Sequence, residues 1–455
     1  MGRPSIVLAL SVVFFTSCTT SDQDSQNLLT REQLLDPQTC QSCHPSHYKE
    51  WSGSMHAYAA DDPVFLAMNR RGQEETDGEL GDFCVQCHAP MALREGATFD
   101  GLNLPDVPQS LKGVTCYFCH SVDGVQGTHN NPLTLADDEV LRGAVTNGVD
   151  NGAHKQAYSS LHDRQSQDSS TLCGTCHDIV MPSGLVLETT YIEWQRSFFS
   201  RPQNEGGLSC GNCHMPSFRD RIAEFATAPV RQRHDHSMPG VDSALIDWPE
   251  IAAQKQAISR ELDPSLLAKL CYNPSNGGSI EVTLENIGGG HSLPSGAAID
   301  RRMWVELTAT LGDRVLFQTG KIADDTPVQS IAKTDDLLWQ IRDHARGVNG
   351  DEAHMFWDID QVDRGTLPPL VTNDPSRPDF VHSETREFPL SQRPDAMEMV
   401  VHIRPIGLDI LDDLIESGHL APSLRAKMQT IDIESTRLTW TSETAGTDLC
   451  VSPNG

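Results

Sequence analysis

The chain has 455 residues, 13 of them cysteine, and a formal net charge of −29. A charge this negative excludes nucleic acid as a partner and loose electrostatic docking on anionic lipid, because no basic surface is available to meet the phosphates. The length predicts two or three domains. Only 21% of the residues are charged, which is too few for a disordered polyanion, yet the 38% hydrophobic fraction is low for this length. We therefore expect something other than side chains to fill part of the core.

The first residues have the pattern of a bacterial export signal. Arg3 precedes an apolar run from Ile6 to Phe15, which is too short to span a bilayer. The four residues that end at Cys18 resemble a lipoprotein signal, in which Cys18 is lipidated and begins the mature chain. An ordinary secretory signal cut near the same place is the alternative. We expect residues 1–17 to be removed and residues 18–36 to form a lipidated tether. The protein would then lie in the cell envelope, on the periplasmic side of the outer membrane or on the cell surface.

Ten of the other twelve cysteines fall into five copies of the pattern C-x-x-C-H. Two thiols three residues apart lie on one side of a helical turn and can reach both vinyl groups of one porphyrin, while the next histidine points at the iron. A single pair could be a thioredoxin-like redox pair or half of a zinc site, but five pairs each followed by histidine favour five covalent haem c groups. The thioether cysteines would be Cys40, Cys43, Cys84, Cys87, Cys116, Cys119, Cys173, Cys176, Cys210 and Cys213. The proximal iron ligands would be His44, His88, His120, His177 and His214.

The five motifs are crowded into the stretch from Cys40 to His214. At this density the haems must pack against one another within electron-tunnelling distance, and the porphyrins would supply much of the apolar core. Short helices and long loops, positioned by iron ligation, are therefore expected in this region.

The sixth ligand of each iron decides between an electron carrier and an enzyme. A second histidine gives an electron-transfer haem, methionine raises the potential, and an empty position admits a substrate. His47 follows His44 too closely to reach the far face of the same haem, and Met91 and Met215 also closely follow proximal histidines, which makes them poor distal ligands. The other histidines of this region are His56, His129, His154, His162, His234 and His236.

Several stretches resemble the cytochrome c-554-type multihaem cytochromes. The first motif is followed by Trp51-Ser52-Gly53-Ser54-Met55-His56-Ala57, Gly113-Val114-Thr115 precedes the third motif, and Met215-Pro216 follows the fifth. The resemblance covers roughly residues 38–245. This chain has five motifs where the type protein has four, and it carries a long C-terminal region in addition.

The resemblance implies distal ligands. His56 stands where the family places one, and His154 and His236 fit its habit of placing a distal histidine before a haem motif or after the last one. His129 is a further candidate. For each of them, an ordinary surface or core histidine is the alternative.

The periodicity changes in the C-terminal part. Asp263 and Pro264 have the pattern of an N-cap and first helical residue, which predicts a short helix to about Leu270. Apolar and polar residues then alternate in several stretches, which predicts an antiparallel β-sandwich at about residues 271–450. One helix, from about Leu408 to Ser417, interrupts it. The predicted fold class is α+β and multidomain, with a pentahaem cytochrome domain of helices and loops (37–262) followed by a β-sandwich domain with a helical insertion (263–455).

Two features of the β-domain carry further predictions. Cys271 and Cys450 stand in its first and last strands, so a disulfide is expected in an oxidising compartment, with free thiols or an intermolecular bridge as alternatives. The loop from Gly288 to Gly296 resembles a G-H-x-x-P-[ST]-G stretch of β-domains appended to multihaem cytochromes. It implies that His291 reaches back to bind a haem iron while Arg301 and Arg302 pair with propionates. The alternative is a glycine-rich turn with a solvent-facing histidine.

Three functions fit these features. We favour a multihaem cytochrome that relays electrons between redox protein partners, whose docking faces would be basic because this chain is acidic. The second is a haem oxidoreductase with one five-coordinate haem that acts on a small nitrogen or sulfur oxyspecies, for which no catalytic residue is assigned. The third is a structural electron conduit in an outer-membrane assembly. The oligomeric state is not predicted.

Overall fold

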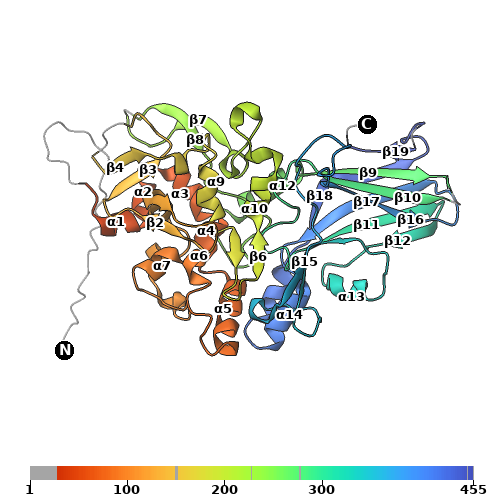
Figure 1. Ribbon diagram of the computed structural model, residues 1–455, viewed down its shortest axis with the longest axis horizontal. Helices are drawn as coiled ribbons and strands as arrows, with labels where there is room; N and C mark the ends of the chain where they lie inside the picture. The colour runs from red at the N-terminus through yellow and green to blue at the C-terminus, as the bar shows by residue number, and fades with distance from the viewer. Residues whose placement is uncertain (1–27, 149–151, 227, 276–277, 448, 454–455) are drawn as a thin grey trace, which may run out of the picture.

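The computed structural model describes residues 28–148, 152–226, 228–275, 278–447 and 449–453. The predicted signal peptide, Cys18 and most of the predicted tether lie outside the described residues. A part built of short helices lies beside a part built of long strands along the longest axis of the molecule (Figure 1). This arrangement confirms the α+β class and the order of the two parts. Among the described residues, no helix is long and apolar enough to cross a membrane.

The N-terminal part consists of short helices joined by loops and two-stranded sheets. Its α-helices are α1 (Arg31–Leu35), α2 (Pro37–Gln41), α3 (Pro45–Ser52), α4 (Met55–Tyr58), α5 (Pro63–Glu75), α6 (Val85–His88), α7 (Pro90–Arg94), α8 (Cys116–Ser121), α9 (Ser169–Gly174), α10 (Thr190–Arg196) and α11 (Cys210–His214). Its 3-10 helices are η1 (Leu104–Asp106), η2 (Gln109–Leu111), η3 (Ser160–His162), η4 (Phe198–Ser200) and η5 (Gln203–Glu205). Its sheets pair β1 (Val122–Val125) with β2 (Leu133–Leu135), β3 (Val140–Gly143) with β4 (Lys155–Tyr158), β5 (Asp178–Val180) with β6 (Val186–Thr189), and β7 (Ser217–Arg221) with β8 (Val230–His234).

The start of the described chain is folded rather than a tether. Thr30 and Gln33 form a capping box that begins α1, and Asp36 caps α2 with Pro37 as its first residue. Leu34 is buried in a cluster with Tyr117 and Phe118 of α8. The expectation that the tether extends to residue 36 is therefore wrong for residues 28–36, because the apolar side of α1 packs against the domain.

The C-terminal part is a sandwich of two antiparallel sheets. One has the strand order β16 (Ser383–Pro389), β10 (Ser279–Asn286), β9 (Leu266–Asn273) and β19 (Cys450–Val451). The other has the order β12 (Arg314–Thr319), β11 (Arg302–Leu311), β17 (Ala396–Arg404) and β18 (Ile431–Thr441), with β13 (Gln340–Ile341) also paired to β11. Alternate residues of the long strands form one core between the sheets, as the period-two pattern predicts.

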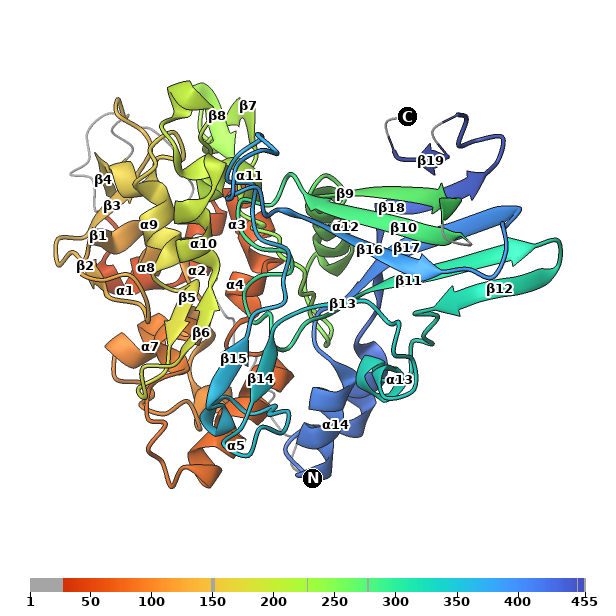
Figure 2. The same ribbon diagram turned by 45° about the vertical axis from the view of Figure 1, so that its right-hand side comes forward.

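Smaller elements surround the sandwich. They are α12 (Ile251–Leu262), α13 (Val328–Ala332), η7 (Phe356–Asp358), α14 (Leu408–Glu416), η8 (Pro422–Lys427) and the pair β14 (His344–Arg346) with β15 (Gln361–Asp363). Figure 2 shows α14 and the β14–β15 hairpin extending from the sheets toward α5. The apolar face of α14 packs with Val64 and Met68 of α5, so the predicted helical insertion exists and joins the two parts.

The predicted helix from Asp263 to Leu270 is wrong. The helix there, α12, ends at Leu262 with Asp263 as its C-cap, and Leu266 already begins β9. Pairing of β9 with β10 buries Leu266, Ala268 and Leu270 on one face of the sheet. This long-range strand pairing outweighs the local helix-start pattern of Asp263 and Pro264. The predicted disulfide is present, since Cys271 of β9 and Cys450 of β19 are direct partners in the sheet and are bonded.

Candidate functional site

A single large cavity connects all five motifs. Its volume is about 2860 Å³, and it is lined by the cysteines and histidines of every C-x-x-C-H copy. Pockets for one small molecule usually occupy about 300–1,000 Å³. The cavity, which we call the motif cavity, therefore has room for several large groups, and it extends to the β-domain loop that carries His291.

Each motif forms a helical turn that presents its side chains to the motif cavity. The backbone N–H of His44 donates to the Cys40 carbonyl over 2.8 Å, and His177 donates in the same way to Cys173 over 3.2 Å. Two of the turns are capped directly before the first cysteine: Thr115 caps α8, and Ser209 forms a capping box at α11. Local capping thus fixes the direction in which the motif side chains leave the backbone.

The stretches that resemble the c-554-type cytochromes meet in space at His56. Ser54 caps α4, the Trp51 indole donates to the Val114 carbonyl over 2.8 Å, and the Val114 N–H donates to the His56 carbonyl over 2.8 Å. Gly113 has a positive φ of 68°, and a Cβ there would lie 2.5 Å from the His56 carbonyl oxygen. Only glycine fits so close to the backbone of His56.

Four motif histidines face a second histidine across the motif cavity. The ring centroids are 6.3 Å apart for His44 and His154, 6.2 Å for His177 and His56, 6.4 Å for His120 and His236, and 6.3 Å for His214 and His291. Two imidazoles that bind one metal from opposite sides, each through a nitrogen about 2 Å from the metal, have centroids about 6 Å apart. All four pairs thus have the separation that axial ligation of an iron between them requires.

Hydrogen bonds at the other ring nitrogen orient these histidines. A backbone carbonyl can only accept, so a ring nitrogen bonded to one carries the proton and leaves Nε2 with the lone pair that a metal needs. Nδ1 makes such a bond in six of the paired histidines. The partners are the carbonyls of Ile222 for His44 (2.6 Å), Arg142 for His120 (2.6 Å), Lys155 for His154 (3.1 Å), Pro239 for His214 (2.8 Å), His234 for His236 (2.9 Å) and Ser292 for His291 (2.9 Å).

Burial keeps several of these imidazoles neutral, which metal binding also requires. Desolvation lowers the pKa of His56, His177 and His236 to about 4. It also lowers the pKa values of His44, His120 and His291. The donor set therefore fits c-type haem, with imidazoles opposite one another and the two cysteines of a motif beside each motif histidine.

The second motif differs from the other four. The His88 ring is stacked on Phe65 of α5, with centroids 4.1 Å apart and ring planes 3° from parallel. Its Nδ1 donates to the Ala59 carbonyl over 3.3 Å. Among the described residues, no second histidine ring is in contact with it. In the described part of the chain, the histidine of this motif therefore has no facing imidazole.

The remaining histidines of the region occupy other positions. His129, a distal candidate from the sequence, is exposed, shares a hydrogen bond with Thr128 and does not line the motif cavity, so it does not join the ligand arrangement. His162 lies 5.7 Å from His120, but its Nε2 is bonded to the Cys119 carbonyl. His47 stands edge-on to His236 at 4.8 Å. These contacts indicate packing roles for His47 and His162.

Cysteines of different motifs are in contact and define the spatial order of the motifs. Side-chain contacts join Cys40 to Cys116, Cys87 to Cys176 and Cys173 to Cys210. Cys119 also raises the pKa of Cys173 through charge repulsion. The first motif therefore neighbours the third, the third neighbours the fourth, and the fourth neighbours both the second and the fifth. Sequence order alone could not give this order.

The loop of His291 docks on the N-terminal part through one carboxylate. Glu193 of α10 accepts from the Ser292 N–H and from the Ser295 hydroxyl, each over 3.0 Å. Asn286 holds the same loop from the β-domain side by donating to the His291 carbonyl over 2.8 Å. These bonds place His291 opposite His214, in the motif cavity rather than in solvent.

The two arginines after this loop have different roles. Arg301 lines the motif cavity and forms a bidentate ion pair with Asp242 at 2.6 and 2.7 Å. Arg302 is fully buried away from the cavity and pairs with Asp409 of α14. The expectation that both arginines face propionates is therefore wrong for Arg302, because Asp409 of α14 holds its guanidinium in the buried interior of the β-domain.

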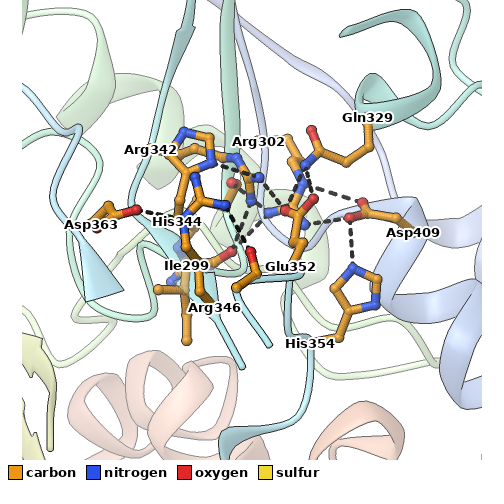
Figure 3. Close-up of polar contacts among 12 residues, drawn as sticks. Ile299, Arg302, Gln329, Arg342, His344, Arg346, Glu352, His354, Asp363 and Asp409 are labelled. Atoms are coloured by element: carbon orange, nitrogen blue, oxygen red, sulfur yellow. Dashed lines mark hydrogen bonds and ion pairs between the residues drawn. The ribbon is translucent and has the colours of Figure 1, made fainter. Parts of the chain in front are cut away.

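Figure 3 shows Arg302 within a network that also contains Glu352, His354 and Asp409. These three donors lie close enough together to hold a metal ion. However, Arg342 forms an ion pair with Glu352, and Arg302 forms one with Asp409. The guanidinium groups therefore already supply the positive charge that a cation would bring. The network is better explained as a buried set of ion pairs that fastens α14 to the sandwich.

Comparisons with known proteins agree with this architecture. Residues 39–121 match the family model of cytochrome c554 and c-prime, which confirms the resemblance found in the sequence. The crystal structure of a penta-heme cytochrome c552 from Thermochromatium tepidum is similar to the chain, with a TM-score of 0.58 and 18% sequence identity, and the alignment covers 90% of this chain and 98% of that one. The chain thus has the fold of that cytochrome. A search of the curated proteins finds no match.

Proposed function

We propose that the protein is a multihaem cytochrome c that relays electrons through five covalently bound haem c groups. The observation that carries this proposal is the set of four histidine pairs at 6.2–6.4 Å, each with one member in a C-x-x-C-H motif. The ten motif cysteines and the five proximal histidines line the same cavity. When bound, the haems supply iron centres that accept and release single electrons.

The positions of the motifs in the fold would determine the order in which electrons pass between the haems. Contacts between motif cysteines give the order first, third, fourth, with the second and the fifth as neighbours of the fourth. The carbonyl bonds to Nδ1 hold the imidazoles in one tautomer and orientation, so little rearrangement accompanies a change in charge. The route therefore branches at the fourth motif.

Haem analysis and electron paramagnetic resonance of the purified protein test this proposal. We expect five haems per chain by mass and four low-spin ferric signals. Replacing one paired histidine, as in His154→Met, should alter one low-spin signal, whereas His129→Met changes an exposed histidine and should alter none. A chain that carries no covalent haem would refute the proposal.

A second function, a haem oxidoreductase, is favoured by one observation. The described residues offer His88 no partner imidazole, and Phe65 stacks on its ring. An open position at the second motif would admit a small nitrogen or sulfur oxyspecies. A high-spin ferric signal that disappears on addition of cyanide, and that is absent in His88→Ala, would support this function. An exclusively low-spin spectrum would exclude it.

The proposal includes a location in the cell envelope and redox protein partners. Lipidation of Cys18 would hold the protein at a membrane of the cell envelope, and the net charge of −29 suits redox partners with a basic docking face. The Cys18→Ser protein should leave the membrane fraction. Electron exchange with a basic monohaem cytochrome should slow as ionic strength rises.

A further inference from the structure

A second, smaller cavity lies against the motif cavity at the junction of the two parts. Its volume is about 160 Å³, which leaves room for several waters. It shares four lining residues with the motif cavity: Met55, Asp62, Asp242 and Ile406. Its other lining residues include Lys255, Ser259 and Gln429, all exposed. The small cavity therefore lies between exposed residues of the surface and the lining of the motif cavity.

Carboxylates stand where the two cavities meet. Asp62 caps α5 by accepting from the Val64 N–H over 2.9 Å, and it lines both cavities. Asp242 also lines both and is held by Arg301. Asp62 lies three residues before Phe65, the residue that stacks on His88. The junction is therefore on the side of the second motif.

Two more carboxyl groups continue from this junction into the motif cavity. Asp300 is only 8% exposed, lines the cavity and has no side-chain hydrogen bond to any described residue. Glu188 also lines the cavity, close enough to Cys87 of the second motif to influence its thiol. A buried carboxylate without a partner is costly, so its position in a cavity wall needs a reason.

Burial raises the pKa values of three of these carboxyl groups toward neutral pH. Burial, reinforced by Asp242, raises the pKa of Asp62 to about 7. Burial raises the pKa of Glu188 to about 7 and that of Asp300 to about 6, although Arg301 acts in the opposite direction on both. The other charged groups that face them are Asp178, Arg302, His354 and Asp409.

We propose that the small cavity and the carboxyl groups of Asp62, Asp242, Glu188 and Asp300 form a proton path from the domain junction into the motif cavity. The path couples reduction of the protein to proton uptake, and it rests on the haem binding proposed above. Each of up to three electrons that a reducing partner gives to the haem-loaded protein would be matched by one proton that moves from solvent to a carboxylate oxygen of Asp62, Glu188 or Asp300. The charge inside the cavity then stays constant.

The physical reason is electrostatic. An added electron removes one positive charge from the cavity, and this raises the pKa of every nearby acid. Acids that already titrate near neutral pH then bind a proton, whereas an ordinary aspartate would stay ionised. Asp62, Glu188 and Asp300 would therefore take up the protons, and Arg301 fixes the position of Asp242 beside them.

The pH dependence of the midpoint potentials tests the proposal. In the haem-loaded wild-type protein, the potentials should fall as the pH rises from about 5 to about 8. In the double variant Asp62→Asn with Asp300→Asn, the slope should decrease about twofold or more, because two proton acceptors are lost. Asn still caps a helix, so α5 should persist. The matched control is Asp313→Asn, which removes an exposed carboxylate from the turn between β11 and β12 and should leave the slope unchanged.

A second variant tests the route itself. Ser259 is exposed on α12 and lines the small cavity, so Ser259→Phe should narrow the entrance and slow proton uptake after rapid reduction by several-fold. An uptake rate equal to that of the wild type would overturn the route. An unchanged slope in a haem-loaded double variant would overturn the coupling. A chain without haem would instead refute the proposed function, so the two failures are distinguishable.

Discussion

His214 and His291 face each other with their ring planes 10° from parallel and their centroids 6.3 Å apart. His214 is the last residue of α11, whereas His291 belongs to a loop that leaves the β-sandwich after β10. The β-domain is therefore part of the site, because it supplies one of the four second histidines and also the cavity wall around Asp300 and Arg301.

Replacing His291 tests this contribution. In His291→Ala, we expect one low-spin signal of the oxidised protein to become high-spin, because its iron loses an axial imidazole. The visible and paramagnetic spectra of His129→Ala, an exposed histidine, serve as the control. Unchanged spectra in the His291 variant would show that the histidine only fills space at the junction.

The contact between α14 and the loop of His354 should depend on pH. Hydrogen bonding to Asp409 raises the pKa of His354, whose Nδ1 also lies 3.1 Å from Asp413. A raised pKa means that the stabilisation is fully present below the unfolded value of about 6.5 and is lost as the pH rises through the folded value. We expect His354→Gln to destabilise the protein by about 1 kcal/mol at low pH, after allowance for partial exposure, and by little in alkaline solution. Thermal unfolding of both proteins across this pH range measures the difference, and a constant difference would contradict the assignment.

Arg302 should be among the most sensitive residues of the β-domain. Its side chain is fully buried and pairs with Asp409, which is itself mostly buried. Replacing one member of a buried ion pair leaves the other uncompensated, so Arg302→Met should cost about 3–5 kcal/mol in the free energy of unfolding. Arg314→Met, at an exposed position of β12, is the matched control and should cost little. Denaturant unfolding monitored by tryptophan fluorescence gives both values.

The disulfide should matter for the β-domain and not for the motif cavity. Cys271 and Cys450 are 179 residues apart, so their bond closes almost the whole β-domain. In the chain-entropy model, a loop of this length contributes up to about 5 kcal/mol. Cys271→Ser with Cys450→Ser should therefore lower the melting temperature of the domain while the haem content stays the same. Loss of haem in this variant would show that the two parts fold together.

Local chemistry made a large part of this protein predictable from sequence. The covalent motifs depend only on residues within five positions of one another, and the strands of the sandwich depend on a period of two. The helix predicted from Asp263 to Leu270 is absent because pairing of this segment with β10, a long-range contact, outweighs the local N-cap pattern at Asp263. The predicted tether is wrong over residues 28–36 for the same reason, since α1 is held by contacts with α8.

The sequence by itself determined the five motifs with the histidine that ends each of them and indicated the two-part organisation and the disulfide, because each depends on spacing along the chain or on the small number of cysteines left over. Only the tertiary structure decided which histidine faces which motif. His56 follows the first motif but faces His177 of the fourth, and His291 comes from another domain. It also decided that, within the described residues, His88 of the second motif has no facing imidazole, and that Asp62 and Asp242 lie where the two cavities meet. Histidines that face each other across the cavity are far apart in the chain, so no local sequence pattern can show that they are close in space.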